Sequence, residues 1–387
     1  MRPIIGSIDS HRTTTTTTTS GGTTTSTTTL FGALPALEGF GSQAGGASTP
    51  TVVHVTNLNA SGAGSLHNAI VDTNPTGKTI VFDVGGTIHA RHNMSVGNNF
   101  TIDGTTAPYP GITITSSVDD GMTIESANMH HIIVKGLAFV GCVNDGLGVN
   151  DGAHDIAVMH CIAYGNGDGN IDFSSDSLNC TMQYCIIGNH DQSVNPSNQG
   201  TGGTLVTAHF TTIHHNLFFP KSPNPDEGER FPFVHRNYGV ASTPDCDIRN
   251  NLVWQYGRGN ATGSGYGSYA GYGAKANIVS NYYKTTSAAA APDGVCIDCD
   301  GSDSIHGSVY SNGNVSGNGF NFNIAPLNNH AEFAIAAQYQ VTLDTACAAA
   351  LKILQYAGPT QRNPIGGLRP PTHQSYIDGV TLPLTGC

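Results

Sequence analysis

The chain has 387 residues, of which only 11% are charged, and it contains 49 glycines. This length is enough for one large domain or two ordinary ones, and the composition is typical of short strands and frequent turns rather than of a helical enzyme. A net charge of -12 argues against nucleic acid and anionic membranes as partners. The sequence has no run of about 18 apolar residues, so no membrane-spanning helix is predicted.

The N-terminal region has a composition of its own. Residues 13–29 are almost entirely threonine, serine and glycine, so we expect residues 1–49 to form an arm or linker and residues 50–387 to form the folded domain. The start of the chain lacks the apolar stretch of a signal peptide. Nine cysteines and several Asn-x-Ser/Thr sequons nevertheless favour a secreted, extracellular glycoprotein whose signal is not visible in this numbering. The sequons begin at Asn59, Asn93, Asn99, Asn179, Asn260 and Asn314.

A short sequence pattern recurs along the middle of the chain. It consists of an alternating β-rich stretch, a polar corner and a second apolar stretch. Successive corner residues are 25, 24, 31, 35 and 30 positions apart, and no helical periodicity lies between them. Steps of this size predict the stacked coils of a β-solenoid, whereas a β-propeller would repeat every ~40–45 residues. The corner residues are Gly136, Cys161, Cys185, Asn216, Asn251 and Asn281.

The corners and the two ends of the solenoid have structural interpretations. The corner asparagines are expected to stabilise the fold, because Asn tolerates tight turns and can hydrogen-bond to an Asn on the next coil. Residues 65–72 are predicted to form a short helix after a glycine-rich turn. Residues 343–357, followed by Gly358 and Pro359, are predicted to form a second helix that packs on the solenoid.

Several blocks, in a specific order, resemble a known family. The first three are VTNLNASGAGSLHNAI at 55–70, IVFDVGGTI at 80–88 and TIDGTTAPYPGITI at 101–114. They are followed by IHHNLFF at 213–219, Arg-x-Pro at 230–232, NNLVWQYG at 250–257 and LKILQYAGPTQRNP at 351–364. From about residue 50 to about residue 370 the chain therefore resembles the pectate lyases, a group of family 1-like polysaccharide lyases. The resemblance implies an all-β fold, a right-handed single-stranded parallel β-helix of the pectin lyase-like type, with a short N-terminal cap helix.

The resemblance also implies a reaction, the cleavage of pectate by β-elimination. A base removes the proton beside the uronate carboxylate, and the negative charge that develops there must be neutralised. In the family, a bound Ca2+ neutralises this negative charge, because Ca2+ is a hard cation that takes oxygen ligands. The positions that match the calcium ligands are Asp145, in VNDGLGV, and Asp168 and Asp172, in Asp-x-x-x-Asp. A bridging Ca2+ would also let an acidic protein bind an acidic polysaccharide.

The basic side of the predicted site departs from the family pattern. Arg230 matches the proposed base, although an arginine normally keeps its proton because its pKa is above about 12. His235 stands where the family has a second arginine, and Arg236, one step further, would face the other side of a strand. The family's substrate-binding lysine has no counterpart at 188–193. Lys221, in an acidic insertion, is the candidate to replace it.

Two functions remain open from the sequence. A calcium-dependent lyase acting on pectate or another acidic polysaccharide is favoured by the three aspartates and Arg230. The alternative is a catalytically degenerate β-helix that serves as a structural subunit of an extracellular filament or surface assembly, and that associates with itself through the threonine-rich arm. The low charge, the acidic insertion and the missing basic residues favour this alternative.

Overall fold

The computed structural model describes residues 34–45, 49–72, 77–89, 92–94, 97–191, 193–196, 202–220, 230–235, 245–256, 266–285, 293–297, 306–317, 330–359 and 371–387. The body considered below runs from Leu37 to Cys387, and Met1–Ala36 is a separate unit. The threonine-rich stretch, and with it the self-association predicted for it, lies outside the described residues. Among the helices that the structure describes, none has the length and apolar character needed to cross a membrane.

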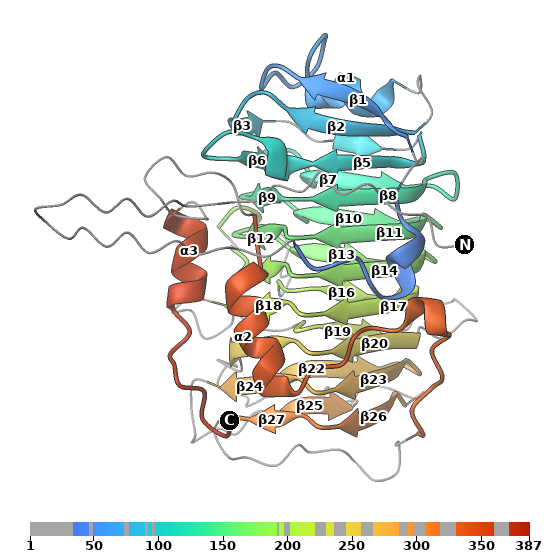
Figure 1. Ribbon diagram of the computed structural model, residues 1–387, viewed down its shortest axis with the longest axis vertical. Helices are drawn as coiled ribbons and strands as arrows, with labels where there is room; N and C mark the ends of the chain where they lie inside the picture. Colours follow the sequence, from blue (N-terminus) through green and yellow to red (C-terminus); the bar gives the residue numbers. More distant parts are fainter. Residues whose placement is uncertain are drawn as a thin grey trace, which may run out of the picture. The chain divides into compact units, whose positions relative to one another are not determined.

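The described strands form three parallel sheets, and the chain passes from one sheet to the next around each coil (Figure 1). The ten-stranded sheet contains β1 (Thr51–Val55), β2 (Lys78–Phe82), β5 (Phe100–Asp103), β8 (His130–Lys135), β11 (His154–Met159), β14 (Leu178–Gln183), β17 (His209–His214), β20 (Asp245–Arg249), β23 (Lys275–Val279) and β26 (Ser308–Asn312). The nine-stranded sheet contains β3 (Gly86–His89), β6 (Ile112–Thr115), β9 (Leu137–Val140), β12 (Ile162–Tyr164), β15 (Ile186–Ile187), β18 (Leu217–Phe218), β21 (Leu252–Tyr256), β24 (Tyr282–Thr285) and β27 (Val315–Ser316). The eight-stranded sheet contains β4 (His92–Met94), β7 (Met122–Glu125), β10 (Leu147–Asn150), β13 (Ile171–Phe173), β16 (Leu205–Val206), β19 (Phe233–His235), β22 (Tyr266–Gly271) and β25 (Asp293–Ile297).

The strand register keeps the same kind of side chain inside on every coil. In the ten-stranded sheet, Phe100, Ile132 and Ile156 are paired on successive coils, and all three are fully buried. Because side chains alternate between the two faces of a strand, such stacks build one continuous apolar core inside the coils. The predicted parallel β-helix is confirmed.

The register corrects one predicted corner. Ala138 pairs with Ile162, so Cys161 aligns with Leu137, and Gly136 aligns with His160. Gly136 and His160 both have a left-handed backbone, with φ of 71° and 49°. The prediction that Gly136 corresponds to Cys161 is therefore wrong by one residue, because glycine marks the turn position before the corner and not the corner itself.

The predicted asparagine ladder is present at the corner between the ten- and nine-stranded sheets. The main-chain and side-chain N–H groups of Asn216 both donate to Asn251 Oδ1, each at 3.0 Å. Asn251 donates in the same way to Asn281 Oδ1, at 2.8 and 3.0 Å. The ladder continues to Asn314, whose Oδ1 accepts from Asn281. Asn314 Nδ2 donates to the Ile278 carbonyl and to Ser311 Oγ, so both of its amide hydrogens are used at the end of the ladder.

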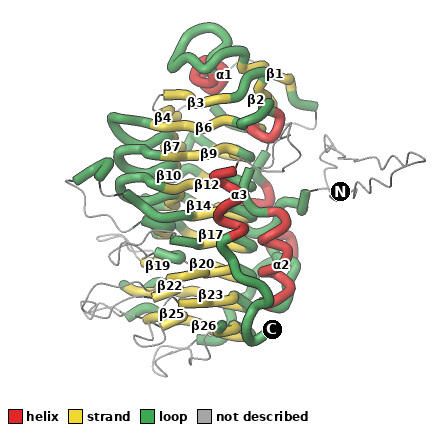
Figure 2. The backbone as a smooth tube through the Cα atoms, turned by 90° about the vertical axis from the view of Figure 1, so that its left-hand side faces the viewer, coloured by secondary structure: helices red, strands yellow, loops and turns green. Residues whose placement is uncertain are grey.

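Both predicted helices are present. Helix α1 (Leu66–Val71) begins after Ser65, whose Oγ accepts from the Asn68 N–H. Helix α2 (Ala346–Tyr356) begins later than predicted because Thr345 caps it. A further helix, α3 (Pro371–Asp378), was not predicted from the sequence. Figure 2 shows α2 and α3 on one side of the coils, and their apolar residues pack with outward-facing side chains of the nine-stranded sheet.

The outer face of the ten-stranded sheet is covered by segments from both ends of this body. The short 3-10 helix η1 (Phe40–Gln43) lies on β11, β14 and β17. Another 3-10 helix, η2 (Gly104–Thr106), directly follows β5 and contacts the neighbouring strands β2 and β8. Beside η1 runs the segment 330–345, which contains the 3-10 helix η3 (Ala337–Tyr339). Thr342 Oγ1 donates to Glu38 Oε1 at 2.6 Å, which ties the two segments together.

Candidate active site

Four aspartates lie at the edge where strands of the eight-stranded sheet begin. Asp120 and Asp145 precede β7 and β10, and the pairing of Met122 with Leu147 places them on neighbouring coils at equivalent positions. Asp168 precedes β13, and Asp172 lies within it between two core residues, so its side chain faces outward. The structure thus brings the three predicted calcium residues to one edge and adds Asp120, which sequence reasoning missed.

Asp120, Asp145 and Asp172 each accept a hydrogen bond from a main-chain N–H of the following coil. Asp145 Oδ1 accepts from the Gly169 N–H at 2.7 Å, and Asp172 Oδ1 accepts from the Leu205 N–H at 2.9 Å. Gly169 is needed where it stands, because a Cβ there would lie 2.3 Å from Asp172 Oδ2. At Asp168-Gly169-Asn170 the backbone therefore passes close to the Asp172 carboxylate, so this segment is not a generic polar turn.

Arg230 is brought to the same edge from a later coil. Its Nη1 donates to Asp168 Oδ1 at 3.1 Å and lies 3.7 Å from Asp172 Oδ2. Its carbonyl accepts from the Thr204 N–H at 2.8 Å. The backbone of Arg230 is left-handed, with φ of 64°. A residue other than glycine in this backbone conformation costs about 1–3 kcal/mol, and such residues are often found where the surrounding structure holds a functional group in place.

Burial and neighbouring charges shift the pKa values of Asp145, Asp172 and Arg230 at this edge. Burial raises the pKa of Asp145 well above its ordinary value, and Asp172 and Asp120 raise it further. Burial also raises the pKa of Asp172, to about 7, although Arg230 opposes this shift. Burial alone would lower the pKa of Arg230, but Asp172 and Asp168 outweigh it and hold this pKa above its ordinary value. In this arrangement Arg230 is a counter-ion to the carboxylates, not a base.

The donor chemistry of the edge fits a hard cation such as Ca2+. Carboxylate oxygens are the ligands that Ca2+ prefers, and the mutual repulsion of Asp145 and Asp172 is what a bound cation relieves. Among the described residues, no three His, Cys, Asp or Glu side chains already converge as a ligand set. Arg230 lies close to two of the three candidates, so a cation would have to replace the guanidinium contacts.

Of the predicted substrate-binding residues, His235 lies in the part of the chain that the structure describes. His235 ends β19, where its ring contacts Phe233 at a centroid distance of 4.9 Å and Tyr272 at 5.5 Å. Lys221 and Arg236 lie outside the described residues. Asp120 could have been found from the sequence, since Asp-Gly directly precedes the strand in DDGMTI just as it does in NDGLGV.

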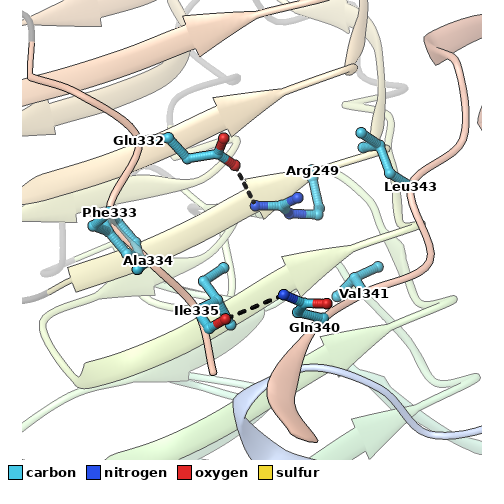
Figure 3. A pocket seen from close by; sticks show the side chains of 8 residues that line it. All are labelled: Arg249, Glu332, Phe333, Ala334, Ile335, Gln340, Val341 and Leu343. Atoms are coloured by element: carbon cyan, nitrogen blue, oxygen red, sulfur yellow. Dashed lines mark hydrogen bonds and ion pairs between the residues drawn. The ribbon is translucent and has the colours of Figure 1, made fainter. Parts of the chain in front are cut away.

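A pocket elsewhere on the body is not part of this edge. It has a volume of about 420 Å3 and lies on the ten-stranded sheet. Two stretches of segment 330–345, at 332–335 and 340–343, line it (Figure 3). Arg249 faces it, paired with Glu332 at 3.4 Å and with the fully buried Asp247. Because two carboxylates neutralise Arg249, the pocket does not offer an uncompensated cation to an acidic sugar.

The three-sheet coil, the asparagine ladder and the acidic edge define a pectate lyase-like, right-handed parallel β-helix. Solved structures share this fold. The major cedar pollen allergen jun a 1 aligns with a TM-score of 0.61 at 15% identity, over 84% of this chain and 92% of its own. A pectate lyase bound to a hexasaccharide aligns with a TM-score of 0.58 at 16% identity, over 84% of this chain and 97% of its own. A Bacillus sp. N165 pectate lyase in complex with trigalacturonate aligns with a TM-score of 0.54 at 16% identity, over 83% and 98%.

Curated sequences agree with the structural likeness. The chain is 30% identical over 251 residues to probable pectate lyase C of Aspergillus fumigatus, which covers 65% of this chain and 54% of the relative. It is 28% identical over 255 residues to probable pectate lyase C of Aspergillus oryzae, with the same coverage. The chain spans about half the length of these relatives. No protein-family model matches the sequence.

Proposed function

We propose that the protein is a calcium-dependent polysaccharide lyase that cleaves pectate outside the cell by β-elimination. The observation that supports this most directly is the edge itself, where three acids match the family's calcium ligands and two of them, Asp168 and Asp172, lie close to Arg230. Relatives named pectate lyase C, and similar solved structures with trigalacturonate or a hexasaccharide, support a galacturonate polymer as substrate.

The residues present have definite tasks in this reaction. Asp145, Asp168 and Asp172 would hold Ca2+, which neutralises the uronate carboxylate while the neighbouring carbon loses its proton. Arg230 can accept that proton only as a neutral guanidine. It must therefore first release its own proton to solvent, which requires that the two carboxylates that raise its pKa are drawn away from it. His235 and, beyond the described residues, Lys221 and Arg236 are the candidates for binding substrate carboxylates.

Arg230→Ala is expected to abolish lyase activity on polygalacturonate. β-Elimination leaves a double bond conjugated to a carboxylate, so the product is followed by its new ultraviolet absorbance. The matched control is Lys275→Ala, which removes an exposed cation from the ten-stranded sheet and should leave activity unchanged. Full activity in Arg230→Ala would exclude Arg230 as the base, and no product from the unaltered protein would reject the lyase proposal.

Calcium dependence is tested separately. A chelator should suppress product formation by the unaltered protein, and added Ca2+ should restore it. Asp172→Asn is expected to need more Ca2+ for half-maximal activity, because one anionic ligand is lost. Activity that persists in excess chelator would leave the lyase proposal standing but refute the role given to Ca2+.

A further inference from the structure

Asp120 extends the acidic edge by one coil. It lies opposite Asp145 on the preceding coil, and Asp120 Oδ1 accepts from the Asp145 main-chain N–H at 3.0 Å. Asp120 Oδ2 accepts from the buried Thr123 hydroxyl at 3.3 Å. Asp120 therefore fixes the backbone of Asp145, just as Asp145 fixes Gly169.

This chain of contacts ends at the candidate cation site. Asp120 holds Asp145, Asp145 Oδ1 holds the Gly169 N–H, and Gly169 packs directly against the Asp172 carboxylate. A displacement of Asp120 is therefore transmitted to Asp145 and, through Gly169, to Asp172, two of the three candidate ligands. The negative charge of Asp120 also lies close to the site, because its Oδ1 is 3.0 Å from the main-chain nitrogen of Asp145.

A role in the turn alone does not require a carboxylate at this position. An asparagine would accept the same main-chain hydrogen bond without repelling its neighbours. The adjacent Asp119 differs from Asp120, since its Oδ1 accepts from the Asn144 side chain on the next coil and not from the main chain of Asp145. A fourth carboxylate beside Asp145 and Asp172 is unfavourable until a cation compensates for it.

We propose that Asp120 is a positioning residue of the candidate Ca2+ site, which orients Asp145 through its main chain and strengthens cation binding through its charge. The inference rests on the proposed function, since it assumes that the acidic edge binds Ca2+. It goes beyond that function because Asp120, on the coil before the three predicted ligands, contributes to the affinity for Ca2+.

Two variants separate the effects of charge and hydrogen bond. Asp120→Asn keeps an oxygen acceptor for the Asp145 N–H but removes the charge, and Asp120→Ala removes both. Calorimetric titration of the full chain with Ca2+ is expected to give a dissociation constant raised about tenfold in Asp120→Asn, which corresponds to one pKa unit of electrostatic interaction, and raised further in Asp120→Ala. Asp119→Asn is the matched control, and its affinity should stay within about twofold of the unaltered protein.

A second measurement does not depend on Ca2+. Amide hydrogen exchange at Asp145 should become faster in Asp120→Ala, because its acceptor is gone, and should be nearly unchanged in Asp120→Asn. Unchanged exchange in Asp120→Ala would overturn the positioning role, and unchanged Ca2+ affinity in Asp120→Asn would overturn the charge role while the proposed function stands. If the unaltered protein binds no Ca2+, the calcium dependence and the charge role both fail, and exchange at Asp145 still decides the positioning role.

Discussion

Single side chains stabilise this fold where their hydrogen bonds cannot be replaced. Asn251 is almost fully buried, and its Oδ1 accepts two N–H groups of Asn216 while its Nδ2 reaches the Ile213 carbonyl at 2.8 Å. A buried polar group that loses its partner costs about 1–3 kcal/mol. The ladder thus depends on the amide side chain itself, which explains why Asn recurs at these corners.

Asn251→Ala is expected to lower the free energy of unfolding by about 3 kcal/mol or more, because it leaves several buried groups of Asn216 and the Ile213 carbonyl without their partner. Chemical denaturation followed by circular dichroism measures this change. Asn312→Ala, at an exposed position outside the ladder, should change stability by less than about 0.5 kcal/mol. Equal effects in the two variants would contradict a structural role for the ladder.

Arg230 shows how far residue identity determines chemistry. The motif Arg-x-Pro identifies it from the sequence, and the structure places it against Asp168 and Asp172. Its protonation is decided by these two neighbours, which come from an earlier coil and precede it by about 60 residues in the chain. A local motif therefore predicts which residue reaches the site but not whether it is an acid or a base there.

At the scale of elements, the N-terminal and C-terminal segments meet over a buried histidine pair at the end of β17. His214 and His215 share a hydrogen bond through their Nδ1 atoms at 2.9 Å, and His214 Nε2 donates to Gln183 Oε1 at 3.1 Å. His215 Nε2 lies 3.0 Å from Asp344 Oδ2, before α2. Gln183 Oε1 also accepts from the Glu38 N–H. When His214 donates through Nε2, its Nδ1 can only accept from His215, so a second proton on His214 would set two N–H groups against each other.

The pair predicts a pH-dependent stability. Burial lowers the pKa of His214 well below its ordinary value, and His215 and Arg249 lower it further. Its contribution to stability is therefore complete above the unfolded pKa near 6.5 and is lost as the pH falls toward the folded pKa, at about 1.4 kcal/mol per pH unit. Urea unfolding from pH 7.5 to pH 5 should show a steeper loss for the unaltered protein than for His214→Gln. Parallel curves for the two proteins would contradict this assignment.

On the scale of the whole body, the C-terminal region packs against the outer face of the nine-stranded sheet. Helices α2 and α3 cover outward apolar side chains such as Ile162, Leu217 and Leu252. A disulfide joins Cys347, in the first turn of α2, to Cys387 across 40 residues. The cross-link holds the last segment of the chain to the helix that covers the sheet.

Cys347→Ser with Cys387→Ser is expected to lower stability by about 2–4 kcal/mol, because a loop of this length is no longer closed in the unfolded chain. Thermal unfolding with and without a reducing agent measures the effect. Reductant should bring the unaltered protein down to the melting temperature of the double variant and should not affect the variant. A variant as stable as the unaltered protein would show that packing alone holds α2 and α3 in place.

The sequence alone determined the repeat, the corner asparagines, the two capped helices and the identity of the acids and Arg230. The repeat, the corner asparagines and the helices follow from local rules, since strand alternation, turn chemistry and helix signals depend on residues a few positions apart. The acids and Arg230 were identified through the resemblance to the pectate lyases. Tertiary structure decided what depends on coil stacking. It aligned Gly136 with His160, paired Cys347 with Cys387, added α3 and set Asp120 beside Asp145. Loops of unequal length separate the coils, so only the folded register shows which acids meet at one edge and that Arg230 is held there as a cation.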